Sequence, residues 1–90
     1  MTDKKRRNIS LTIDEIKTLI CVQLGLKKVR GTDHIVEDLG AESADVVNII
    51  AAVEDKYGII IEEEEVLRTQ TVDDLSVLVS SKLQSTKIMH

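Results

Sequence analysis

Three stretches of aliphatic residues recur at the spacing of one helix face, and this pattern restricts the chain to an all-α fold. The sets are Ile13, Ile16, Leu19, Ile20 and Leu24, then Val46, Val47, Ile49, Ile50 and Val53, and finally Leu75, Leu78, Val79 and Leu83. The run of isoleucines at 59–61 has no alternating segment to pair with, and a lone strand is unstable. We interpret this run as an extended linker whose side chains fill the core.

Residues that favour helix ends set the boundaries of the first two helices. Ser10 or Thr12 is the expected N-cap of the first helix, with a capping box from Thr12, and Gly25 ends it. The second helix is expected over residues 43–57, because Gly58 follows in a typical C-terminal position.

A short third helix is expected over residues 62–68, and Thr71 with Asp74 caps the fourth. The connection 25–42 is long for a small domain, which favours a functional role. Its expected anchors on the core are Ile35, Val36 and Leu39. The chain is thus expected to form a four-helix bundle over residues 10–83, with a basic flexible arm at 1–9 and a flexible tail at 84–90.

The composition of the 90 residues excludes several classes of protein. The length allows one small domain. The single Cys21 excludes an internal disulfide and a cysteine-based zinc site, and His34 and His90 are too few for a metal centre. No apolar run is long enough to span a bilayer, and no secretory signal is visible. A monomer in the reducing cytoplasm is the expected form.

Charge is distributed unevenly along the chain. Residues 1–30 carry eight Lys or Arg and three acids, whereas residues 31–90 carry four bases and thirteen acids. The acidic part is expected to attract basic partner surfaces. The basic start is not expected to bind nucleic acid, because the chain lacks an aromatic stacking platform. Lys27, Lys28 and Arg30 could contact a different partner.

One serine, Ser43, lies within an acidic string that precedes the second helical pattern: Glu-Asp-Leu-Gly-Ala-Glu-Ser-Ala-Asp, residues 37–45. No His or Lys in this string could act as a base for a nucleophilic serine. The domain itself is therefore not expected to be an enzyme. A serine in such a string suits modification by another enzyme, although serine is also a common N-cap.

Several segments of the chain resemble acyl carrier proteins of the phosphopantetheine-binding family. They are Gln-Leu-Gly-Leu at 23–26, the string at 37–45, Ala-Val-Glu-Asp-Lys-Tyr-Gly-Ile at 52–59 and Thr-Val-Asp-Asp-Leu at 71–75. The resemblance covers roughly residues 11–83. It implies that Ser43 bears a 4′-phosphopantetheine arm, transferred from coenzyme A by a phosphopantetheinyl transferase. The arm would carry acyl groups as thioesters between acyl-transferring and acyl-modifying enzymes of fatty acid, lipid or secondary-metabolite biosynthesis.

The resemblance also implies that acids near Ser43 contact basic docking surfaces on these enzymes. The corresponding positions are Glu37, Asp38, Glu42, Asp45, Glu54 and Asp55. Ala44 stands where the family most often has Leu, and Asn48 where Glu is usual. These departures suggest a specialised carrier with dedicated partners.

An acyl chain could fold back into the aliphatic interior by displacing soft side chains. The expected lining residues are Val46, Ile50, Ile61, Leu67 and Leu75. Two alternatives stay open at this point: a peptidyl or aminoacyl carrier, and an unmodified structural subunit that has kept the carrier fold.

Overall fold

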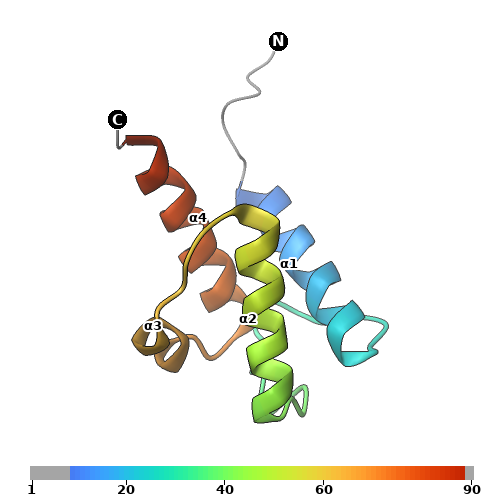
Figure 1. Ribbon diagram of the computed structural model, residues 1–90. Helices are drawn as coiled ribbons and strands as arrows, with labels where there is room; N and C mark the ends of the chain where they lie inside the picture. The colour runs from blue at the N-terminus through green and yellow to red at the C-terminus, as the bar shows by residue number, and fades with distance from the viewer. Residues whose placement is uncertain (1–8, 89–90) are drawn as a thin grey trace.

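Four helices make up the described part of the chain, residues 9–88, in this computed structural model (Figure 1). They are α1 (Ile9–Leu24), α2 (Ser43–Tyr57), α3 (Glu63–Arg68) and α4 (Val72–Ile88). The predicted all-α class, with a long connection between the first two helices and a short third helix, is confirmed. The basic cluster at 4–7 and the last two residues of the predicted tail lie outside the described residues.

The core forms where α1 packs against both α2 and α4. Its most deeply buried side chains are aliphatic: Ile16, Ile20, Ile49, Val53, Val72, Leu75 and Val79. The single aromatic residue lies at the edge of this core, where the Tyr57 hydroxyl donates to Glu15 Oε1 at 2.7 Å. This bond joins the end of α2 to the first half of α1.

Helix α2 has the boundaries that the sequence predicts. Gly58 adopts the left-handed conformation with φ 66°, and its N–H donates to the Glu54 carbonyl at 2.8 Å. A residue with a Cβ is strained in this conformation, so glycine suits the end of the helix. At the other end the N-cap is Glu42 rather than Ser43.

The predicted start of the first helix is wrong. Helix α1 already includes Ile9, so Thr12 lies inside the helix and forms no capping box with Glu15. The Thr12 side chain is buried on the same face as Ile16 and Ile20, at intervals of four residues. This position explains why a residue typical of N-caps occurs within a helix here.

Helix α4 begins as predicted. The Thr71 N–H donates to Asp74 Oδ2 and the Asp74 N–H donates to Thr71 Oγ1, each at 3.0 Å, which forms a reciprocal capping box. The helix continues to Ile88, beyond the predicted boundary at Leu83.

The extended linker between α2 and α3 fills the core with two of its three isoleucines. Ile59 and Ile61 are buried, whereas Ile60 is exposed, contrary to the prediction that all three point inward. Successive side chains of an extended backbone point to opposite sides, so the middle residue faces solvent.

Candidate functional site

The turn before α2 directs the chain from the core to the surface. The Asp38 N–H donates to the His34 carbonyl at 2.8 Å, and Gly40 ends this turn in the left-handed conformation with φ 74°. Ala41 then enters the core, where it is buried. Because the following residues leave the core, Ser43 is exposed at the first position of α2.

Backbone hydrogen bonds fix this connection to the start of α4. The Ile35 N–H donates to the Gln70 carbonyl at 2.9 Å, and the Val72 N–H donates to the Asp33 carbonyl at 3.1 Å. The Ile35 side chain is buried between these bonds. The connection therefore presents Ser43 from a fixed position, although it contains no long regular element.

The first turn of α2 is arranged to receive an anion beside Ser43. Intrahelical bonding starts at Val46, whose N–H donates to the Glu42 carbonyl at 2.9 Å. The N–H groups of Ser43 and Ala44 precede this bond and carry the positive end of the helix dipole. The Glu42 N–H is already paired, at 3.0 Å from Asp45 Oδ2.

An apolar groove opens directly beside Ser43. Its volume is about 850 Å³ and it runs between α2, the linker and α3. Besides Ser43 its lining contains Val36, Ala41, Glu42, Val46, Val47, Ile50, Ala51, Glu54, Ile61, Glu63, Val66 and Leu67. No His, Lys or Cys lies among these residues, so the groove has no such side chain that could activate the serine.

A second, smaller cavity of about 230 Å³ adjoins the groove. The two share part of their walls, including Val46, Ile50 and Leu67. Of the predicted acyl-lining residues, these three line both spaces, Ile61 lines the large groove, and Leu75 lines the small cavity. The structure thus has open space at this position without any displacement of side chains.

Three large apolar side chains at this groove are exposed to solvent. The exposed fractions are 50% for Val36, 65% for Val47 and 73% for Leu67. The prediction that Val36 and Val47 belong to the core is wrong. Val47 follows Ser43 by one helical turn and therefore lies on the same face of α2. Exposed apolar residues that cluster in this way mark an interaction site.

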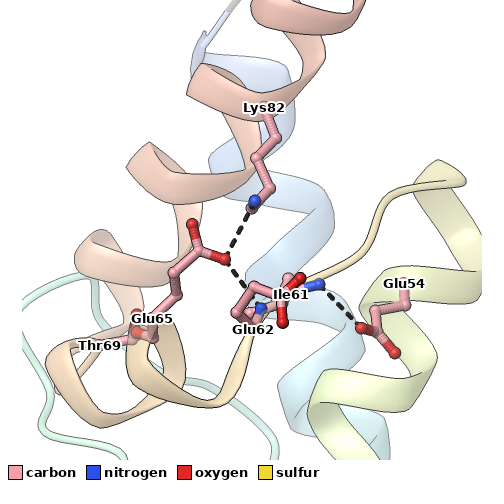
Figure 2. Close-up of polar contacts among 6 residues, drawn as sticks. All are labelled: Glu54, Ile61, Glu62, Glu65, Thr69 and Lys82. Atoms are coloured by element: carbon pink, nitrogen blue, oxygen red, sulfur yellow. Dashed lines mark hydrogen bonds and ion pairs between the residues drawn. The ribbon is translucent and has the colours of Figure 1, made fainter.

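Some of the predicted docking acids have structural bonds as well. Glu54 is half-buried, and its Oε2 accepts the Ile61 N–H at 2.8 Å (Figure 2). Asp38 Oδ2 accepts the His34 N–H at 2.7 Å. These carboxylates stabilise the backbone around the groove, in addition to any role in binding a partner.

The other predicted docking positions are open to solvent, except for Asp45, which is half-buried and accepts the Glu42 N–H. Glu37, Glu42 and Asp55 are exposed, as are Ala44 and Asn48, although Ala44 and Asn48 do not line the groove. Glu63 contributes a further carboxylate to the groove, although no sequence pattern distinguishes it from the neighbouring glutamates.

Helix α3 forms one wall of the groove and has no buried residue. The Glu65 side chain connects α3 to the linker and to α4. Its Oε1 accepts the Glu62 N–H at 2.8 Å and lies 3.0 Å from Lys82 Nζ on α4 (Figure 2). These two interactions lower the pKa of Glu65, with the larger effect from the backbone N–H of Glu62. Polar contacts therefore hold this wall together with the packing of half-buried Val66 against the core.

Two other kinds of site find no support within residues 9–88. No group of three or more His, Cys, Asp or Glu side chains is placed to hold a metal ion there. None of the described helices is long and apolar enough to cross a membrane.

Comparisons with known proteins give the family of this chain. The family model described as "Phosphopantetheine attachment site" matches residues 14–79. The acyl carrier protein of Wolinella succinogenes is 41% identical over 64 residues, which cover 69% of this chain and 84% of that protein. The crystal structure of an acyl carrier protein from Thermotoga maritima superposes with a TM-score of 0.74 at 28% identity, covering 87% of this chain and 93% of that one.

The chain therefore belongs to the phosphopantetheine attachment family, and its role is that of an acyl carrier protein. The predicted cofactor, 4′-phosphopantetheine, and the prediction that the domain is a carrier rather than an enzyme are both confirmed by these relatives. Family membership also implies contact with a phosphopantetheinyl transferase and with acyl-handling enzymes.

Proposed function

We propose that Ser43 is the attachment point of the 4′-phosphopantetheine arm. Ser43 is exposed at the start of α2, where the first N–H groups of the helix favour an anion, and it lines an apolar groove. A phosphodiester on its oxygen would lie at the positive end of the helix dipole, which offsets repulsion from Glu42 and Asp45. The proposal rests on one observation: Ser43 lies both at the start of α2 and in the lining of the groove.

The attached group supplies a thiol at the end of a flexible arm, which holds an acyl group as a thioester. The protein's own residues keep the attachment oxygen accessible, bind the phosphodiester and shield an apolar cargo. Because no His or Lys lines the groove beside Ser43, we expect the transferase to supply the base that takes the serine proton.

Intact mass spectrometry tests the attachment. The purified apo protein is incubated with coenzyme A and a promiscuous phosphopantetheinyl transferase. The wild type should gain the mass of one phosphopantetheine group, and Ser43→Ala should gain nothing. Ser81, an exposed serine on α4, provides the matched control, because Ser81→Ala should be loaded like the wild type. Loading of Ser43→Ala would refute the assignment.

Acidic residues around the groove form the proposed docking surface for basic partner enzymes. Glu37, Glu42 and Asp55 are exposed, and Glu63 adds a carboxylate to the rim of the groove. Their attraction for Lys and Arg would speed encounter and weaken with salt. We expect Glu42→Gln to slow loading by the transferase more at low salt than at high salt, with Asp14→Gln, an exposed acid on α1, as control.

The groove and the adjoining cavity are the proposed shelter for the acyl chain. An acyl group on Ser43 could enter along Val46 and Ile50 and reach Leu75 in the smaller cavity. Burial of each methylene contributes about 0.8 kcal/mol. Longer saturated chains on the holo form should therefore raise the melting temperature and shift the amide signals of these residues.

Matched variants sharpen this test. Leu67 and Val77 are both largely exposed, yet only Leu67 lines the two spaces. Leu67→Ala should reduce the stabilisation gained from a long acyl chain, and Val77→Ala should leave it unchanged. A melting temperature that does not depend on chain length would argue against the shelter.

Ala44 and Asn48 support a carrier with dedicated partners. Ala44 is exposed, so a larger side chain there could reach a partner's apolar pocket. A lost apolar anchor costs on the order of 1–2 kcal/mol at an interface. Ala44→Leu should therefore increase acylation by a housekeeping ligase or ketosynthase. An unchanged rate would show that Ala44 does not set specificity.

We propose a monomer in the cytoplasm that binds no nucleic acid. A peptidyl or aminoacyl carrier would show the same loading but would be charged by an adenylating enzyme with an amino acid. An unmodified structural subunit would stay bare in the loading assay.

A further inference from the structure

A second groove lies on the outer side of α1, away from Ser43. It has a volume of about 540 Å³ and is formed by the second half of α1 and the segment that follows it. Its lining consists of Asp14, Lys17, Thr18, Cys21, Val22, Leu26, Lys27, Lys28 and Val29. We call it the α1 groove. None of these residues lines either space beside Ser43.

The walls of the α1 groove are basic. Lys17, Lys27 and Lys28 contribute three ammonium groups, against the single carboxylate of Asp14. No ion pair joins these lysines to a carboxylate of the described residues. The positive charges are therefore available to an acidic ligand, in a protein whose net charge is −4.

Part of the groove lining is apolar. Val22 is 73% exposed, Leu26 is half-buried, and Val29 is buried. Half-buried Cys21 also packs against the core at this point. An exposed valine beside other apolar side chains and under a basic rim is typical of a surface that binds an amphipathic segment.

The α1 groove and the Ser43 groove lie on different sides of the bundle. In Figure 1, the segment that follows α1 lies at the right of the molecule, whereas α3, a wall of the Ser43 groove, lies at the left. The two surfaces also have opposite charge. A basic enzyme at Ser43 and an acidic partner at α1 could thus be bound at the same time.

We propose that the α1 groove docks an acidic amphipathic segment of a partner protein. Its apolar residues would cover Val22 and Leu26, and its carboxylates would pair with Lys27 and Lys28. Val22 is the single large apolar side chain of the lining that is largely exposed, and so small an apolar face favours a narrow peptide segment over a bilayer, which contacts a broad apolar face. The absence of an aromatic residue from the lining disfavours single-stranded nucleic acid.

The test uses a synthetic helical peptide with Leu at positions i, i+4 and i+7 and Glu at most others, titrated into the full-length apo protein. Amide signals of Thr18, Cys21, Val22 and Leu26 should shift, and the affinity should fall with added salt. The same peptide with Lys in place of Glu should cause no shift at these residues.

Two pairs of variants separate docking from general electrostatics. Lys27→Glu/Lys28→Glu should weaken binding of the acidic peptide by at least about tenfold, because like charges then oppose each other. Lys56→Glu/Arg68→Glu changes the net charge equally at exposed positions elsewhere and should leave the affinity within about twofold. Val22→Ser should weaken binding, whereas Val77→Ser, at a similarly exposed valine of α4, should not.

Several results would overturn the proposal. One is that the amide signals of the groove do not shift at acidic peptide concentrations up to the millimolar range. Another is that the basic peptide binds as tightly as the acidic one. A third is that the two charge-reversal variants lose affinity for the acidic peptide equally. Shifts at the groove when the protein alone is concentrated would identify a second copy as the occupant. Shifts produced by vesicles of phosphatidylglycerol, but not by the peptide, would identify a membrane surface. Loading of Ser43 in all these variants should stay normal, so the outcome is independent of the proposed attachment site.

Discussion

The hydrogen bond from the Ile61 N–H to Glu54 predicts a loss of stability when that carboxylate is removed. Glu54 Oε2 lies 2.8 Å from the Ile61 nitrogen, and the Ile61 side chain is buried where the linker passes from α2 to α3. Glu54→Ala would leave this N–H without its acceptor, at a cost of about 1–3 kcal/mol. Because Glu54 is half-buried, water can partly replace it, so we expect about 1–2 kcal/mol.

Urea unfolding followed by circular dichroism measures this loss. For a domain of this size each kcal/mol lowers the melting temperature by about 4–8 °C. Glu54→Gln keeps an oxygen acceptor without the charge, so it should retain most of the stability while it weakens docking of a basic partner. The two variants therefore separate the structural role of Glu54 from its proposed docking role.

Asp55 supplies the control for this prediction. It is the next residue along α2, it is exposed, and Asp55→Ala should change stability by less than about 0.5 kcal/mol. Equal stability of Glu54→Ala and Asp55→Ala would refute the argument that the carboxylate of Glu54 holds the linker.

Other interactions around the site give further predictions. The N–H groups of Thr71 and Gln70 lower the pKa of Asp74, so its contribution to stability is present at neutral pH and is lost as the pH falls below about 4; acid unfolding should show a smaller pH dependence in Asp74→Asn. Gly58→Ala should cost about 1–2 kcal/mol in urea unfolding, because φ is 66° there, and no loss would contradict the left-handed helix end. Lys82→Ala removes a partly exposed ion pair with Glu65 and should cost about 0.2–1 kcal/mol at low salt; the same loss in 1 M NaCl would argue against an electrostatic origin.

The second helix could be predicted to the residue because its end signals are local. Gly58 needs only its own backbone conformation to end the helix, and the acidic string marks its start. The start of α1 could not be predicted in this way. Thr12 is typical of an N-cap, but it is buried on the core-facing side of α1, and burial depends on packing that one segment does not encode.

The position of Ser43 could be predicted from sequence, whereas the groove beside it could be predicted only in part. Aliphatic spacing shows that Val47 lies on an apolar face, but it does not distinguish a face that packs in the core from one that borders a groove. Val36 and Leu67 come from other segments and meet Val47 only in the folded protein. The spacing of aliphatic residues could not show that these three side chains are exposed.

In the folded protein, acidic and basic side chains line two separate grooves. The carboxylates of Glu42, Glu54 and Glu63 line the groove beside Ser43, and the lysines at 17, 27 and 28 line a separate groove. The sequence could predict two regions of opposite charge, since the first 30 residues are basic and the rest acidic. Only the packing of the segment after α1 shows that the basic region also includes apolar lining residues.

The most direct test of the carrier role is peptide mass spectrometry of the protein isolated from its native cells under conditions that preserve thioesters. The fragment that contains Ser43 should carry phosphopantetheine, with an acyl group on part of the material. A native protein that is bare at Ser43, or that carries the group on another residue, would contradict the account.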